Sequence, residues 1–111
     1  MLTPAPTPRI HLALQPVDLR GGFDALSALV KNHLRLDPLS GQWFVFTNRR
    51  RHRVKVLYWD GSGFWICAKR LERGRFSWPG GEEAVHALRP EEWSALIHGL
   101  EATPKGSWLR R

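Results

Sequence analysis

The stretch TNRRRHRVKVLYWDGSGFWICAKRLERGRFSWP, residues 47–79, contains the pattern that decides the fold. Its two apolar runs, 54–59 and 64–68, are rich in the β-branched and aromatic residues that are typical of strands. Residues 60–63, Asp-Gly-Ser-Gly, separate the two runs and are a strong turn signal. The pattern therefore predicts a β-hairpin with a cationic segment on each side of it.

The periodicity of apolar residues on either side of the hairpin predicts the other elements. Residues 9–14 alternate like a short strand, and apolar residues recur at helical spacing over 23–34, before Asp37-Pro38 ends the helix. We expect further a strand at 42–46, an extended segment at 75–78 and a helix at 90–99. The predicted class is α+β: a small antiparallel β-meander of three to five strands, with one helix before it and one helix after it.

The strands of this meander carry apolar residues on both faces. Val54 and Val56 point to one side, and Leu57 and Trp59 point to the other. We expect the two helices to cover one face of the sheet. The other face then needs either the first strand and the C-terminal segment around Trp108, or a partner protein, to cover it.

Length and composition predict one compact domain. The 111 residues fit a single globular domain at 9–101, preceded by a flexible, proline-containing lead-in at 1–8 and followed by a tail at 102–111. A hydrophobic fraction of 42% with six Trp and five Phe is too high for a disordered chain.

The charge of the chain indicates a polyanionic partner. The formal net charge is +7, which raises a positive surface potential and favours DNA, RNA or an acidic protein face. No apolar run is long enough for a membrane span, and no secretory signal is apparent, so we expect a cytoplasmic protein without a membrane partner. Cys67 is the single cysteine, which excludes an intrachain disulfide, and its place in an apolar strand predicts a buried thiol.

The acidic residues do not form a catalytic pattern. Two-metal strand-transfer chemistry needs several carboxylates that converge from rigid strands on paired metal ions. Here the aspartates fall mostly in turns or at a helix start, and four glutamates flank the last helix: Asp18, Asp24, Asp37, Asp60, Glu82, Glu83, Glu91 and Glu92. The five histidines lack metal-ligand spacing. We therefore expect a protein that is not an enzyme and that needs no metal and no cofactor.

The candidate nucleic-acid-binding residues come from the two cationic segments: Arg49, Arg50, Arg51, Arg53 and Lys55 before the hairpin turn, and Lys69, Arg70, Arg73 and Arg75 after it. Guanidinium groups match phosphate geometry in a bidentate way. The two segments are separated by an even number of strands, so we expect them at the same end of the sheet. The alternative interpretation is a solvated hairpin end whose arginines discourage strand-to-strand aggregation.

The tryptophans of the strands allow two interpretations. Packing in the core or on a sheet face is the simpler one. The functional one is an exposed aromatic platform for a partner protein or for unpaired bases, and its candidate residues are Trp59, Trp65 and Trp78.

Four ordered motifs resemble a known family. Residues 18–26, DLRGGFDAL, resemble its D-x-R-x-G-F-D-x-L opening, and residues 42–46 with the arginine-rich loop resemble L-F-V-F-x-x-R-R. Residues 54–61 are similar to I-K-x-L-x-x-D-G, and residues 69–79 match K-R-L-E-x-G-x-F-x-W-P almost residue for residue. The family is TnpB, the second open reading frame product of IS66-type bacterial insertion sequences. The resemblance covers residues 10–100, whereas the ends of the chain follow no pattern of the family.

The resemblance implies an accessory factor of transposition that acts beside a separate, larger transposase. Together with the cationic segments, it leads us to expect a non-catalytic protein that contacts the DNA backbone, without base-specific readout, inside a transposase complex. The alternative is an adaptor that binds the transposase through an apolar sheet face and does not contact DNA. Homo-oligomerisation stays open at this stage.

Overall fold

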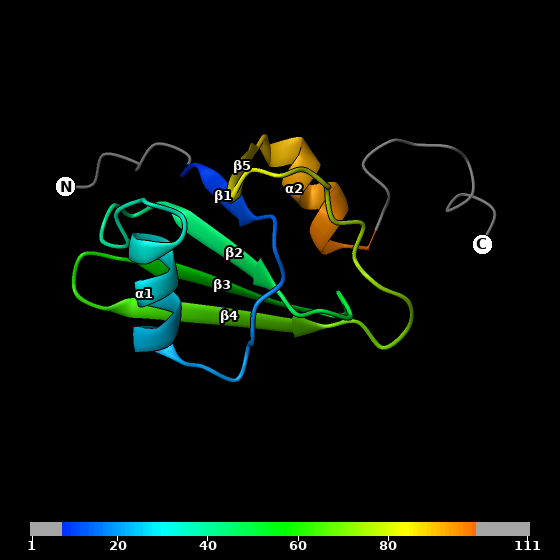
Figure 1. The fold of residues 1–111 in the computed structure, drawn as a ribbon, viewed down its shortest axis with the longest axis horizontal. Helices are drawn as coiled ribbons and strands as arrows, with labels where there is room; N and C mark the ends of the chain where they lie inside the picture. Colours follow the sequence, from blue (N-terminus) through cyan, green and yellow to red (C-terminus); the bar gives the residue numbers. More distant parts are fainter. Residues whose placement is uncertain (1–7, 100–111) are drawn as a thin grey trace.

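The computed structural model describes residues 8–99 (Figure 1). Five strands and two helices follow one another along these residues: β1 Ile10–Ala13, α1 Phe23–Asn32, β2 Trp43–Thr47, β3 Arg53–Trp59, β4 Phe64–Arg70, β5 Val85–Leu88 and α2 Pro90–Ile97. The α+β class and the placement of one helix before and one after the hairpin are confirmed. The lead-in expected at 1–8, apart from Pro8, and the tail expected at 102–111 lie outside the described residues.

The five strands form one sheet in the order β4-β3-β2-β1-β5. The hairpin is confirmed, because β3 pairs with β4 in antiparallel register from Arg53↔Arg70 to Trp59↔Phe64. The expectation of a purely antiparallel meander is wrong, because β1 and β2 run parallel. The connection between them contains α1, and a strand–helix–strand crossover returns the chain to the same end of the sheet.

The extended segment expected at 75–78 is not a strand. It packs across the sheet, where Phe76 and Trp78 are buried, and the indole Nε1–H of Trp78 donates to the carbonyl of Ala13 at 2.9 Å. The sequence analysis missed β5, whose residues pair antiparallel with β1 at the second edge of the sheet. β5 is only four residues long, and its pattern shows no clear alternation.

The two helices lie on opposite faces of the sheet, which corrects the expectation that both cover one face. On the α1 face, Leu26 and Val30 pack against Phe44, Phe46 and Leu57. On the other face, the α2 face, a second core joins Leu96 of α2, Phe76 and Trp78 of the connection, and the sheet residues Ile10, Leu12, Val45, Val54 and Val56. Residues 71–84 and α2 therefore supply the cover that the sequence analysis assigned to the first strand and the Trp108 segment, or to a partner.

Candidate nucleic-acid interface

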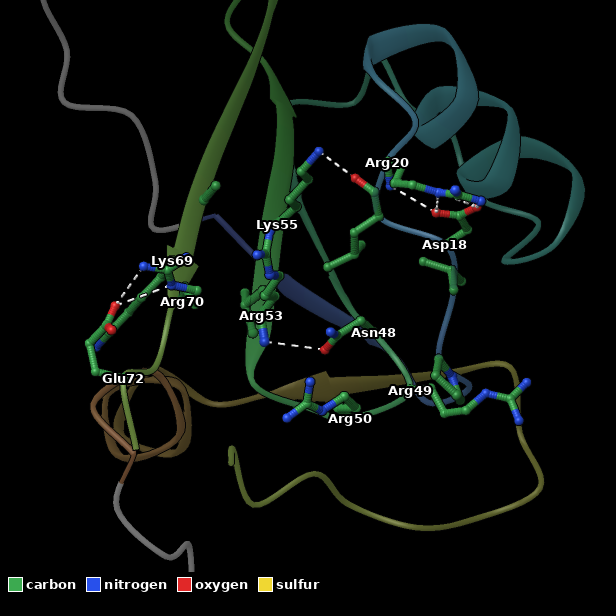
Figure 2. Close-up of a pocket in the computed structure, with 15 residues that line it drawn as sticks. Asp18, Arg20, Asn48, Arg49, Arg50, Arg53, Lys55, Lys69, Arg70 and Glu72 are labelled. Atoms are coloured by element: carbon green, nitrogen blue, oxygen red, sulfur yellow. Dashed lines mark hydrogen bonds and ion pairs between the residues drawn. The ribbon is translucent and has the colours of Figure 1, made fainter. Parts of the chain in front are cut away.

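A basic groove opens beside the ends of β3 and β4, with a volume of about 1160 Å³. Three segments form it: residues 16–20 between β1 and α1, residues 48–50 of the arginine-rich connection, and the neighbouring ends of β3 and β4 with Glu72. Figure 2 shows their side chains around one hollow, with Asp18 and Arg20 on one side and Arg70 and Glu72 on the other. The cationic residues that line it are Arg20, Arg49, Arg50, Arg53, Lys55, Lys69 and Arg70.

The register of the hairpin brings the two cationic segments together. Arg53 and Arg70 are directly opposite each other on β3 and β4, and residues in such a pair project from the same face with Cβ atoms about 5 Å apart. Beyond the strands, the amide of Leu71 donates to the carbonyl of His52 at 2.8 Å, so the two connections also stay paired. The prediction that both segments lie at one end of the sheet is confirmed.

A small residue lies between longer ones in the lining of the groove. Ala68 pairs with Lys55 across the hairpin and precedes Arg70 by two positions, so all three share the α1 face. The ammonium of Lys55 does not project freely into the groove. It donates to the carbonyls of Leu19 and Gly21, and thereby fastens residues 19–21 to β3.

Asn48 orders the arginine-rich connection. Its side-chain oxygen accepts the backbone N–H groups of His52 and Arg53, each at 3.2 Å, and its amide nitrogen contacts the ring of His52 at 3.0 Å. Arg49 and Arg50 are left exposed at the tip of this turn. A loop held in this way presents its guanidinium groups with little further loss of conformational entropy on binding.

Two exposed ion pairs flank the groove. Asp18 accepts from Arg20 at 2.8 Å, and Glu72 accepts from Arg70 at 3.1 Å. The side-chain and backbone hydrogen bonds from Arg20 lower the pKa of Asp18 to about 2. The carboxylate of Asp18 is therefore ionised at neutral pH, and each of the two ion pairs occupies one guanidinium of the groove. The sequence analysis did not predict Arg20 as a groove residue, although its i,i+2 spacing from Asp18 in a loop was visible.

The pKa of His52 is lowered by burial and by the arginines around it. Burial lowers its pKa first, and the charges of Arg50, Arg53 and Arg70 lower it further. Arg50 belongs to the connection before the hairpin, Arg53 to the first strand of the hairpin and Arg70 to the second. His52 is therefore neutral at pH 7 and adds no charge to the groove.

Three of the predicted nucleic-acid-binding residues lie outside the groove, and a fourth, Lys69, lines it without a free ammonium. The ammonium of Lys69 points to the α2 face and donates to the carbonyl of Ile97 at 2.6 Å, where it caps the C-terminal end of α2. Arg51, Arg73 and Arg75 do not line the groove. The predicted set therefore contributes the exposed guanidinium groups of Arg49, Arg50 and Arg53, the guanidinium of Arg70 in its ion pair with Glu72, and Lys55 and Lys69 as structural cations.

The three predicted partner-binding tryptophans do not share a surface. Trp78 has only 7% of its surface exposed, which corrects its expected role in an exposed platform. Trp59 is half-buried, and it packs on Phe64 on the α1 face. Trp65 is 52% exposed, and its alternation with Phe64 directs it to the α2 face. Cys67 is exposed two residues further along β4, so the expectation of a buried thiol is also wrong.

Trp65 ends a row of aromatic side chains on the α2 face. Its ring stacks on that of Tyr58 at 6.2 Å between centroids, Tyr58 lies 5.8 Å from Trp43, and Trp43 lies 6.1 Å from Trp93 of α2. Trp65 also donates its indole N–H to Asp60 at 2.7 Å, which fixes the ring at the hairpin turn. This aromatic row lies on the opposite face from the basic groove, with its exposed end at the turn.

The fold and the groove define a small basic α+β domain with a cationic hollow at one end of its sheet. Among residues 8–99, no group of three His, Cys, Asp or Glu side chains is placed to hold a metal ion. No helix in that range is long and apolar enough to cross a membrane.

Comparison with known proteins then shows the family. The chain belongs to the family described as IS66 Orf2 like protein, whose model matches residues 8–106. The resemblance drawn from the four motifs is thereby confirmed, and the protein is an insertion-sequence protein of the accessory type.

Two curated relatives come from Sinorhizobium fredii. The protein named y4jC is 43% identical over 103 residues, which cover 93% of this chain and 88% of the relative. The protein named y4hO is 38% identical over 109 residues, which cover 97% of this chain and 95% of the relative. Both are described as uncharacterized proteins. No solved structure matches the chain.

Proposed function

We propose that this protein is a non-catalytic accessory factor of transposition that contacts the nucleic-acid backbone through the basic groove, within a complex that contains the transposase. The observation that carries the proposal is the convergence on one hollow of four arginines from the connection before β3 and from the paired ends of β3 and β4: Arg49, Arg50, Arg53 and Arg70. Four guanidinium groups in one place repel one another, and a polyanion relieves that repulsion.

The expected binding is electrostatic and largely independent of sequence. If the four arginines each neutralise one phosphate, with a phosphate taking the place of Glu72 at Arg70, the logarithm of the binding constant falls against the logarithm of salt concentration with a slope of about −3.6. Phosphate contacts fix position along a duplex but carry no sequence information. Sequence selection would then come from the transposase.

A salt titration of binding tests this role. The probe is a fluorescently labelled duplex of random sequence, and its anisotropy is followed with the wild-type chain and with a variant that carries Arg49→Gln, Arg50→Gln and Arg53→Gln. We expect the variant to bind more weakly and its slope to be shallower by about 2.7, since each lost phosphate contact removes about 0.9.

The control removes the same number of charges elsewhere. Arg9, Lys31 and Arg35 are exposed and do not line the groove. The variant with all three changed to Gln has the same net charge as the groove variant, and we expect its slope to stay within about 1 of the wild-type slope. Equal losses in both variants would mean that net charge, and not the groove, governs binding.

An adaptor role is the second candidate, and the aromatic row favours it. Trp65 leaves half of its surface exposed beside Tyr58 and Trp43, and large exposed aromatic side chains are typical of protein interfaces. Co-purification with the transposase after nuclease treatment separates the two roles. A DNA-mediated association is lost under nuclease, whereas a direct contact through Trp65 persists and is weakened by Trp65→Ala.

A further inference from the structure

The outer edge of β4 is unpaired among the described residues. β4 is the terminal strand of the sheet and pairs only with β3, and no described helix or strand lies beyond it in Figure 1. It runs for seven residues in continuous register, without proline or a bulge. The opposite edge, β5, has four residues. Proteins usually protect a free edge by making it short, charged or irregular, and β4 has charge only at Lys69 and Arg70.

The backbone groups that face this edge follow from the hairpin register. In an antiparallel pair, alternate residues direct both N–H and C=O to the same neighbour. At the turn, the amide of Asp60 donates to the carbonyl of Gly63, and at the other end the amide of Leu71 donates to that of His52. Both bonds give the same alternation: the odd-numbered residues of β4 bond to β3. The residues with groups that face outward are Phe64, Ile66, Ala68 and Arg70.

We propose that β4 pairs with β4 of a second copy of this chain, antiparallel and centred on Cys67, so that two sheets join into one. In this register the outward-facing residues bond to one another: Ile66 opposite Ala68 of the second copy, and Phe64 opposite its Arg70. Cys67 then lies opposite Cys67 of the second copy in a pair without hydrogen bonds. All seven residues of the strand take part.

The side chains of β4 complement those of a second β4 and not an arbitrary strand. Each cationic residue of one copy lies opposite an aromatic residue of the other. Arg70 lies opposite Phe64, an arrangement that favours cation–π contact, and the aliphatic stem of Lys69, whose ammonium stays on the carbonyl of Ile97, lies opposite Trp65. The small, exposed Ala68 and Cys67 occupy the centre, where the strands approach most closely. No pair in this register sets two like charges opposite each other. Self-complementarity of this kind is what a two-fold interface requires.

The dimer would place two basic grooves on one surface. A two-fold axis between antiparallel strands is perpendicular to the sheet, so the α1 faces of both copies point in the same direction. Arg70 of one copy lies beside Phe64 of the other, so the two Arg70 residues are about 20 Å apart along the strands, at 3.4 Å per residue. This consequence rests on the proposed function, whereas the pairing of β4 does not.

The first test measures the mass of the full chain in solution by sedimentation equilibrium. We expect a reversible dimer whose association strengthens between 50 and 300 mM salt, because each copy carries a net charge of +7 and salt screens their repulsion. Ala68→Pro removes an outward-facing N–H that does not bond to β3. The proposed dimer loses this hydrogen bond once in each copy, so we expect its dissociation constant to rise about 10- to 100-fold. A monomer at all concentrations up to 100 µM overturns the proposal.

The second test uses the thiol and stays informative if Ala68→Pro fails to fold. Residues opposite each other in a pair without hydrogen bonds have Cα atoms about 4.5 Å apart, within the range of a disulfide. Diamide oxidises the two thiols: each gives up a proton and an electron, and the N=N bond of diamide takes both hydrogens to become a hydrazine. We expect the wild-type chain to form a Cys67–Cys67 dimer rapidly at low protein concentration.

The matched control moves the thiol to the hairpin turn. In the variant Cys67→Ser with Ser62→Cys, the thiol is also exposed, but the proposed register separates the two copies of residue 62 by about 30 Å. We expect cross-linking at least tenfold slower than for the wild-type chain. Equal cross-linking rates in the two proteins would overturn the proposed register. They would mean that the thiols meet by random collision or within a dimer that forms through another surface.

Discussion

Asp18 provides a sharp test of the groove, because its removal is expected to strengthen binding. Its carboxylate forms an ion pair with Arg20 at the rim and stays ionised down to a pKa of about 2. Asp18→Asn releases Arg20 for a phosphate and removes a negative charge that a polyanion would approach. The change leaves the size of the side chain nearly unaltered.

The size of this effect follows from the salt dependence. One additional phosphate contact makes the slope of the logarithm of the binding constant against the logarithm of salt concentration steeper by about 0.9. The electrostatic contribution to binding is small near 1 M salt, and 0.1 M salt lies one decade below that concentration, so the added contact is worth about 0.9 decades in the binding constant at 0.1 M. Asp18→Asn is therefore expected to bind duplex DNA up to about eightfold more tightly at 0.1 M salt, with the gain disappearing near 1 M. The gain is smaller to the extent that a phosphate already displaces Asp18 from Arg20 in the wild-type protein.

The assay is the anisotropy titration at four salt concentrations, with Glu82→Gln as the control. Glu82 is exposed and lies outside the groove, so the control changes the net charge by the same amount. We expect Glu82→Gln to bind within about twofold of the wild-type protein, since screening limits its reach to a Debye length of about 10 Å. If Asp18→Asn binds no more tightly than Glu82→Gln, the groove is not where the phosphates lie.

Three further predictions concern stability. Trp78→Phe leaves the buried carbonyl of Ala13 without its 2.9 Å partner, and is expected to lower the free energy of unfolding by about 1–3 kcal/mol in urea denaturation; a loss below 0.5 kcal/mol would contradict this role. Asp60 has a pKa lowered to about 2 by hydrogen bonds, first from the backbone of residue 62, so its contribution is complete above pH 3.8 and is lost as the pH falls to 2. Asp60→Asn should therefore flatten the acid side of the stability profile, and an unchanged profile would refute the assignment. Glu92→Ala removes the carboxylate that accepts the backbone N–H of Arg89 at the start of α2, with an expected loss of about 0.5–1 kcal/mol by thermal denaturation, whereas Glu92→Gln should retain most of the stability.

The basic groove was only partly predictable from the sequence. The convergence of the two cationic segments follows from the number of strands between them, which is a property of chain order. The direction of each side chain within the segments depends on register, and register separates Arg70, on the α1 face, from Lys69, which caps α2 on the other face. Arg20 lies at the groove because of contacts between distant parts of the chain: Lys55 fastens residues 19–21 to β3 across 36 positions, and the amide of Val17 donates to the carbonyl of Thr47.

The sequence by itself determined the elements whose causes are local: the helix over residues 23–32, the hairpin turn at 60–63, the two strands beside it and the helix from Pro90. Apolar periodicity and turn residues act over a few neighbours, so they can be recognised without the fold. Only the tertiary structure decided the parallel pairing of β1 with β2, the existence of β5, and the burial of Trp78 over Ala13. These features depend on contacts between residues 30 to 80 positions apart, and their free energy appears only when the whole sheet has assembled.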